Sequence, residues 1–441
     1  MSADRSLRGP LRCLLLLCCL LLPTLAPAGE TTLTLADGTE YPAWHFGKAQ
    51  APDRLLWLPP DGGFSEAQPR IARMLATLGH EVWLADPFEA NFLPPVPSSL
   101  GRIDPQQTRA LIERVLGDDP RPLFLLASGY GAIVLLQGLH AWQQVHPDDR
   151  RLHAVLLLSP KLYEATPEPG APARLLPIVR HSNARIWLMQ PRKSPWFWKL
   201  EAIRAALAEG GSEVWLQILP GLRDRFHYRP DATEAEQQAA ERLPAWLDEA
   251  LRFLARLPAG ARRPPPLESD SGSAAPRARK AHALEPWQGD PTPPPLDLPV
   301  LGDGRMRLDD LRGQVVLVNF WASWCPPCVH EMPSMEQLAG QLKGRPFRMI
   351  AVNMAEDPDT VRHFLEERVR FTQPVLLDRD GKALRDWKVF AFPTTYLLDH
   401  RGRIRYGVYG AVDWMAPEQR QVIERLLREA ESAAGDGAQG P

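Results

Sequence analysis

Cysteine is scarce in this sequence. Five cysteines occur among 441 residues, and Cys13, Cys18 and Cys19 lie near the N-terminus. Only Cys325 and Cys328 remain beyond them, which excludes a framework of several structural disulfides. A structural zinc site is disfavoured as well, because such sites use four ligands, commonly from two paired motifs. We expect neither a metal nor another bound cofactor.

The sequence also lacks a strong net charge and a long apolar run. A net charge of −2 gives no reason to expect binding to nucleic acid or to an anionic membrane. The apolar stretch Cys13–Leu22 is too short to span a bilayer comfortably. Three arginines precede it and Ala26-Pro27-Ala28 follows, which is the pattern of a secretory signal. We predict a signal peptide over residues 1–28, with an uncleaved membrane-anchoring N-terminus as the alternative.

Residues 29–257 alternate between apolar strand patterns and helical patterns, which favours a mainly parallel sheet covered on both faces. The order resembles an α/β-hydrolase domain. Gly62-Gly63 stands where that family has its oxyanion loop, and Ala127-Ser128-Gly129-Tyr130-Gly131 where it has its nucleophile elbow.

The nucleophile position of that elbow nevertheless falls on Gly129, or on Tyr130 if the register shifts by one. Ser128 comes one residue early, and the acid expected after the strand Arg185–Met189 is missing. His227 alone stands where the family has its histidine. Because a nucleophilic serine needs a base and an orienting partner, we predict a domain without hydrolase activity.

Residues 258–295 are rich in proline, serine and arginine and show neither a two-residue nor a helical period. Such a composition buries too little apolar surface to offset chain entropy. We predict a disordered, semi-extended linker here, and a disordered tail over residues 433–441.

The most specific signal lies at Val315–Pro333. An apolar, β-branched run ends at Trp324 and is followed at once by Cys325-Pro326-Pro327-Cys328 and a helical pattern. A strand that leads into Cys-x-x-C at a helix start is typical of a dithiol redox site. Free N–H groups and the helix dipole at that position favour a thiolate, which is the attacking species in disulfide exchange.

Three motifs in order, FWASWCPPC, EMP and VFAFPTTYLLDHRGRI, resemble the TlpA/ResA-like branch of exported thioredoxin-fold thiol–disulfide oxidoreductases. The resemblance implies a thioredoxin-like domain over residues 296–432. The whole chain is then an α/β protein with a hydrolase-like domain, a Pro-rich linker and a thioredoxin-like domain.

Position assigns Cys325 as the nucleophile and Cys328 as the resolving thiol. The resemblance implies a proton-handling role for Glu331 and a cis-proline loop at Phe392-Pro393-Thr394 that binds substrate backbone. We also expect Trp324 at the contact surface and Trp321 in the core. An ordinary solvated glutamate is the alternative for Glu331.

The resemblance further implies a periplasmic enzyme that reduces disulfides of exported partners, such as apocytochrome c or copper-handling proteins. A membrane thiol reductase would supply its electrons. Oxidation or isomerisation of partner disulfides stays open. A different reading makes the chain a binding protein or hydrolase whose main function lies in residues 29–257, with an accessory redox domain.

Overall fold

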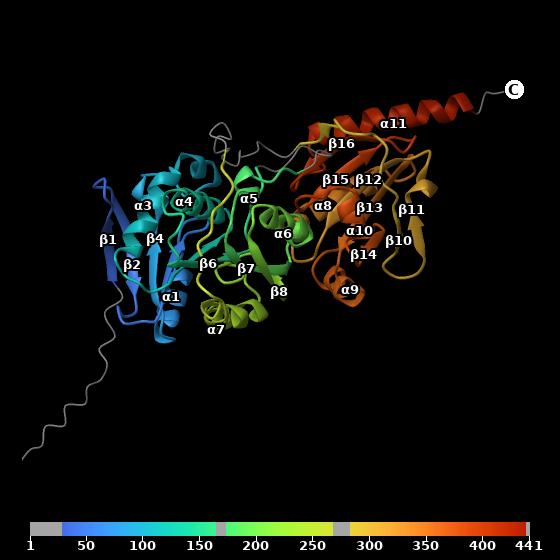
Figure 1. Cartoon of the computed structure of the whole chain (residues 1–441). Coiled ribbons are helices and arrows are strands. Elements are labelled where there is room, and N and C mark those ends of the chain that lie inside the picture. Colours follow the sequence, from blue (N-terminus) through green and yellow to red (C-terminus); the bar gives the residue numbers. More distant parts are fainter. Residues whose placement is uncertain (1–28, 165–172, 268–282, 438–441) are drawn as a thin grey trace, which may run out of the picture.

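The computed structural model describes residues 29–164, 173–267 and 283–437 (Figure 1). The predicted signal peptide, the middle of the predicted linker and the last four residues lie outside the described residues. No helix in the described ranges is both long enough and apolar enough to cross a membrane.

An eight-stranded sheet forms the first domain, in the order β1-β2-β4-β3-β5-β6-β7-β8. β2 pairs antiparallel with β1 and β4, and the other pairs are parallel. This order and the single reversed strand are those of the α/β-hydrolase fold, so the predicted fold class is confirmed. The strands are β1 (Gly29–Thr34), β2 (Glu40–Phe46), β3 (Arg54–Leu58), β4 (Glu81–Ala85), β5 (Leu123–Ser128), β6 (Leu152–Leu158), β7 (Arg185–Lys193) and β8 (Glu213–Arg223).

Helices cover both faces of this sheet, which explains the continuous apolar runs of its central strands. In β3, Leu56 and Leu58 pack on one face, and Leu55 and Trp57 on the other. The first face carries α3 (Pro105–Leu116), α4 (Gly131–Val145), α5 (Pro177–Arg180) and α6 (Leu200–Glu209). The second carries α1 (Ala67–Thr77) and α7 (Glu234–Ala255). Shorter helices are α2 (Pro87–Ala90), η1 (Pro97–Arg102) and η2 (Pro195–Lys199).

A six-stranded sheet in the order β14-β13-β12-β15-β16-β9 builds the second domain, with the thioredoxin-like layout predicted. Its strands are β9 (Glu285–Pro286), β12 (Val315–Trp321), β13 (Phe347–Met354), β14 (Val375–Asp378), β15 (Thr394–Leu398) and β16 (Ile404–Tyr409). β10 (Asp297–Pro299) and β11 (Arg305–Arg307) form a separate hairpin. The helices are η3 (Leu308–Leu311), α8 (Pro326–Gln341), α9 (Pro358–Glu367), α10 (Lys382–Asp386) and α11 (Pro417–Gly437).

The prediction of one disordered linker over residues 258–295 is wrong at both ends. At the first end, the carbonyl of Pro265 accepts a hydrogen bond from His140, and Leu267 packs on the first domain. At the other end, β9 pairs with β16, and the Trp287 ring packs edge-on against Tyr396. The second domain therefore begins before residue 296. The prediction of a disordered tail from residue 433 is also wrong as far as Gly437, where α11 ends.

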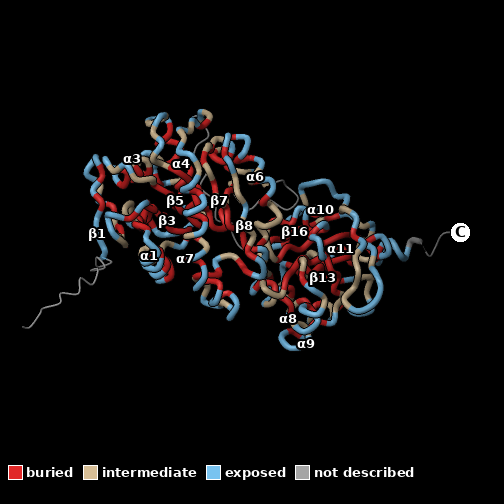
Figure 2. Tube along the Cα trace, turned by 60° about the horizontal axis from the view of Figure 1, so that its bottom comes forward, coloured by how far each residue is buried: buried red, intermediate tan, exposed pale blue. Residues whose placement is uncertain are grey.

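Aromatic side chains join the two domains, which lie side by side in Figures 1 and 2. Phe390 of the second domain is buried against Tyr163 and Trp196 of the first, with ring centroids 5.3 and 5.1 Å apart. In return, Trp198 of the first domain packs against the core of the second. Tyr409 of the second domain also belongs to the first domain's core, so aromatic side chains of each domain pack into the core of the other.

Candidate functional site

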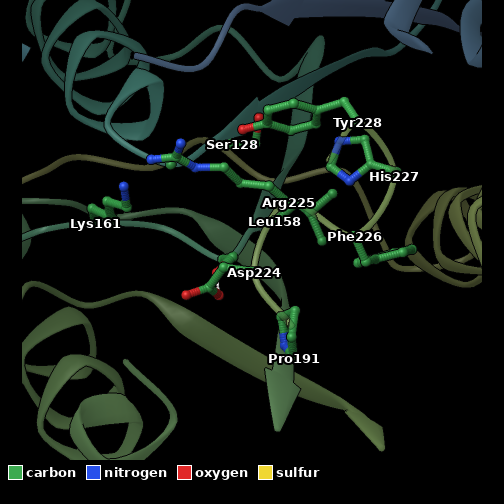
Figure 3. A pocket seen from close by; sticks show the side chains of 11 residues that line it. Ser128, Leu158, Lys161, Pro191, Asp224, Arg225, Phe226, His227 and Tyr228 are labelled. Atoms are coloured by element: carbon green, nitrogen blue, oxygen red, sulfur yellow. Dashed lines mark hydrogen bonds between the residues drawn. The ribbon is translucent and has the colours of Figure 1, made fainter. Parts of the chain in front are cut away.

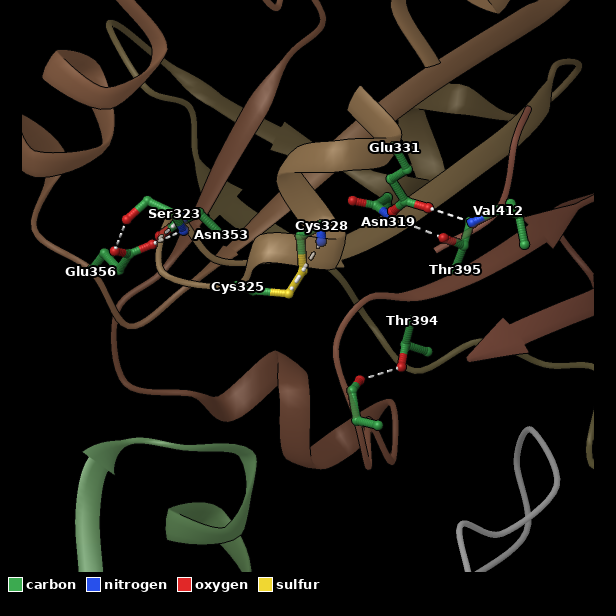
Figure 4. Close-up of a disulfide and its surroundings, with 11 residues drawn as sticks. Asn319, Ser323, Cys325, Cys328, Glu331, Asn353, Glu356, Thr394, Thr395 and Val412 are labelled. Atoms are coloured by element: carbon green, nitrogen blue, oxygen red, sulfur yellow. Dashed lines mark hydrogen bonds between the residues drawn. A yellow bond between two sulfur atoms is a disulfide. The ribbon is translucent and has the colours of Figure 1, made fainter. Parts of the chain in front are cut away.

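The central strand of the second domain, β12, leads into the turn that contains the cysteine pair. All seven residues of β12 are buried, and the strand pairs with β13 and β15. Cys325 caps the N-terminus of α8, and its Sγ accepts a hydrogen bond from the backbone N–H of Cys328 at 3.3 Å (Figure 4). Pro326 and Pro327 fill the first helical positions, where an N–H would have no partner within the helix.

Cys325 and Cys328 are joined by a disulfide with their Cα atoms 5.3 Å apart. Both are largely buried, with exposed fractions of 5% and 1%. Cys325 lines a cleft at the junction of the two domains, beside the exposed Pro326 and Pro327. Cys325 is therefore the sulfur that an incoming molecule meets first.

The predicted cis-proline loop lies against the cysteine pair. The Phe392–Pro393 peptide bond is cis. The Phe392 ring packs edge-on against Trp324 with centroids 5.6 Å apart, and both line the cleft with Cys325. Thr394 is buried, and its hydroxyl donates to the carbonyl of Ala391 at 2.6 Å. Thr394 could thus contact a bound chain only through its backbone.

Glu331 is buried in α8 and is no solvated surface residue. Its carboxylate accepts hydrogen bonds from Asn319 Nδ2 at 2.8 Å, from the Val412 N–H at 3.2 Å and from Trp414 Nε1 at 3.3 Å. Burial raises the pKa of Glu331 to about 8, against the opposing effect of these donors. In Figure 4 the carboxylate points toward Val412.

Sequence reasoning missed Glu356, which holds the turn before Cys325. Its carboxylate accepts hydrogen bonds from the N–H of Ser323 at 2.7 Å and from the Ser323 hydroxyl at 2.5 Å. Asn353 at the end of β13 donates to the same carboxylate at 2.8 Å. An acidic residue directly after a buried strand is the signal that could have revealed it. Trp321, expected in the core, is fully buried.

In the first domain the nucleophile elbow holds no nucleophile. Gly129 has φ +57°, and a Cβ there would lie 2.7 Å from Oδ1 of Asp61. The nucleophile position therefore has no side chain, and a Cβ there would require the Asp61 carboxylate to move. The neighbouring Ser128 is buried, and its hydroxyl has no hydrogen-bond partner among the described residues.

His227 lies near Ser128 but forms no catalytic pair with it (Figure 3). Neither ring nitrogen has a hydrogen-bond partner in the described part of the chain, and burial lowers the pKa of His227 to about 3. The cavity they share has a volume of about 10 Å³, which holds no more than a water molecule. Asp224 accepts hydrogen bonds from Ser159 and Ser194 and orients no histidine.

The described residues contain no group of three or more His, Cys, Asp and Glu side chains that could hold a metal ion.

The second domain is similar in sequence to known proteins. The AhpC/TSA family matches residues 289–407. The thiol-disulfide oxidoreductase ResA of Geobacillus kaustophilus is 36% identical over 136 residues, which cover 31% of this chain and 74% of that protein. The thioredoxin-like protein YneN of Bacillus subtilis is 37% identical over 114 residues, which cover 25% of this chain and 66% of YneN.

A solved structure also overlaps with much of the chain. It is assigned as a dienelactone hydrolase from Klebsiella pneumoniae, is 17% identical and has a TM-score of 0.39, covering 52% of this chain and 99% of its own. The hydrolase-like fold of the first domain rests on its strand order. The second domain contains the Cys-Pro-Pro-Cys turn and matches three quarters of the length of ResA. The chain therefore belongs to the ResA family of thiol-disulfide oxidoreductases.

Proposed function

We propose that Cys325 and Cys328 are the reactive pair of this thiol-disulfide oxidoreductase. The observation that supports this proposal most directly is the position of the Cys325 sulfur. It lies at the N-terminus of α8 and accepts a hydrogen bond from the N–H of Cys328. That donor and the helix dipole stabilise a thiolate at Cys325 in the reduced protein.

In the proposed reaction, the Cys325 thiolate attacks one sulfur of a partner disulfide. A mixed disulfide forms, and the partner's first thiolate leaves and takes up a proton. Cys328 then loses its proton and attacks the Cys325 sulfur, which releases the partner's second thiol and closes the Cys325–Cys328 disulfide. Two electrons pass to the partner, and an external dithiol must return them to the pair.

Glu331 is proposed to handle the proton of Cys328. It follows Cys328 by one helical turn and is buried. A carboxylic acid with a pKa of about 8 exchanges protons near neutral pH, in the range where thiols ionise. Pro393, Phe392, Trp324 and the backbone of Thr394 are proposed to hold the partner's chain beside Cys325.

The proposed partners are disulfide-bearing exported proteins, such as apocytochrome c or copper-handling proteins, and the proposed electron donor is a membrane thiol reductase. The proposed compartment is the periplasm, reached through residues 1–28. Beyond Cys19 the sequence contains no cysteine other than Cys325 and Cys328, which supports a reaction that depends on outside partners.

The reduction potential of the pair, together with its redox state in cells, tests the reductive direction. A reducing potential and a largely reduced pair are expected. A strongly oxidising pair that is found oxidised in cells would reverse the direction to thiol oxidation.

We propose that the hydrolase-like domain, residues 29–257, carries no hydrolase activity. Its nucleophile position is occupied by Gly129, and the Ser128 hydroxyl has no hydrogen-bond partner among the described residues. A fluorophosphonate probe for serine hydrolases should leave the full chain unlabelled. Labelling at Ser128 would restore the alternative in which this domain carries the main function.

A further inference from the structure

The cleft beside Cys325 has a second wall, which comes from the hydrolase-like domain. Its volume is about 290 Å³. The cysteine side contributes Trp324, Cys325, Phe390 and Phe392 together with two prolines. Apart from the Cys325 thiol, this side presents no ionisable group to the cleft. The opposite side comes from segments that follow β6, β7 and β8 at the carboxyl ends of these parallel strands, where α/β sheets bind their ligands.

This second wall is strongly cationic. It presents one acid, Asp224, and five cations, which are Lys161, Lys193, Arg223, Arg225 and Arg229. Asp224 accepts hydrogen bonds from two serines, and the five cations outnumber it.

The five cations differ in how far they are neutralised. Arg223 is buried and paired with Glu236, and Arg229 is paired with Asp231. Lys161 lies 3.7 Å from Asp61, and burial lowers its pKa. Arg225 is about half exposed and pairs with the same Asp61 at 3.5 Å. Lys193 has no acidic side chain within ion-pair distance among the described residues. Lys193, which is unpaired in the described part of the chain, and Arg225, which is half exposed and shares its carboxylate partner with Lys161, are therefore the two cations most accessible to an anionic ligand.

Arg225 has a further distinguishing feature, which is a backbone φ of +62°. Residues other than glycine adopt this conformation at a cost, and such residues cluster at ligand-binding sites. The turn that holds it follows β8, and Arg225 lines both the small cavity around His227 and the cleft at Cys325.

We propose that the cleft binds an extended polypeptide segment whose disulfide-bonded cysteine is flanked by acidic residues, with Lys193 and Arg225 pairing with those acids. This inference rests on the proposed function and names its substrate class. The partner's cysteine forms the mixed disulfide with Cys325 while the flanking carboxylates lie on the opposite wall. The hydrolase-like domain thus determines which partners the redox site binds.

The test uses the reduced full-length protein and two short disulfide-linked peptides that differ only in whether glutamate or lysine flanks the cysteine. The second-order rate of peptide reduction is measured for each and divided by the rate with dithiothreitol, which removes the peptides' intrinsic reactivity. The wild type should favour the glutamate peptide about tenfold, the effect of one or two partly screened charge pairs. High salt should narrow the preference.

The double variant Lys193→Glu/Arg225→Glu should reverse the preference toward the lysine peptide. Arg180→Glu/Arg204→Glu is the matched control, because it changes the net charge equally at exposed ion pairs outside the cleft. It should behave as the wild type. Lys193→Arg/Arg225→Lys should keep the preference, which separates charge from loss of fold.

Equal normalised rates for the two peptides, or a preference that survives the double charge reversal, would overturn the cationic cleft while leaving the redox function intact. Faster reduction of oxidised glutathione than of the glutamate peptide would also overturn it, in favour of a small anionic disulfide. Failure of every variant to reduce either peptide would instead refute the proposed function itself.

Discussion

Phe390 should control access to Cys325, because it holds the cationic wall in place. Its ring is 3% exposed and meets Tyr163 and Trp196 edge-on across the domain boundary. Replacing a buried phenylalanine by alanine costs about 3–5 kcal/mol. Since this burial belongs to the contact between domains, Phe390→Ala should weaken docking by about 100- to 4,000-fold.

Alkylation of the reduced protein measures this effect. The rate of a bulky maleimide at Cys325 is divided by the rate of iodoacetamide, so that changes in thiol reactivity cancel. The ratio should rise in Phe390→Ala, since the wall no longer crowds the large reagent. Trp196→Ala removes the same contact from the other domain and should raise the ratio likewise, without touching the loop that contains Pro393.

Phe92→Ala is the control, since Phe92 is 97% exposed and should change nothing. An unchanged ratio in both Phe390→Ala and Trp196→Ala, with each protein folded, would refute the claim that these rings hold the two domains together.

Three further predictions concern buried polar groups. The pKa of Glu331 is raised from 4.5 to about 8 in the folded protein. As pH rises between these two values, Glu331 loses its proton in the unfolded chain but keeps it in the folded protein. The free energy of unfolding therefore falls over this range, by at most about 5 kcal/mol. Chemical denaturation across this range should give a shallower pH dependence for Glu331→Gln, and identical slopes would contradict the buried acid. His80 is buried, which lowers its pKa, but hydrogen bonds to Asp53 and Asp248 outweigh burial and raise the pKa overall. His80→Asn should therefore cost about 1–3 kcal/mol below pH 6.5, and this cost should shrink as pH rises through the raised pKa; a constant cost would show that His80 is neutral throughout. Glu356→Ala should loosen the turn at Ser323 and speed amide hydrogen exchange there without unfolding α8, whereas unchanged exchange would deny Glu356 this positioning role.

Much of the second domain could be predicted because its sequence patterns are local. The run Val315–Trp321 is apolar except for Asn319, as is typical of a central strand buried on both faces. The cysteine pair follows shortly after it, and Pro326 is favoured at a helix start. The mainly parallel sheet of the first domain was predicted in the same way, from the alternation of strands with helices.

The errors arose where tertiary contacts overrode composition. Residues 258–295 carry too few apolar groups to fold alone, yet Leu267 and Trp287 find apolar surfaces on the two domains. The burial of Glu331 was equally hidden, because its three donors come from β12 and the segment around Val412. No periodicity in either domain could show that Lys193 and Cys325 line one cleft.

Trapping of a mixed disulfide tests the central claim most directly. Cys328→Ser, produced in full length in its native compartment, should hold partner proteins through a bond that mass spectrometry maps to Cys325. Cys325→Ser should hold none, because its remaining sulfur is 1% exposed and lies outside the cleft. If Cys328→Ser captured no partner, or if both variants captured the same partners equally, Cys325 and Cys328 would not form the redox centre of this protein.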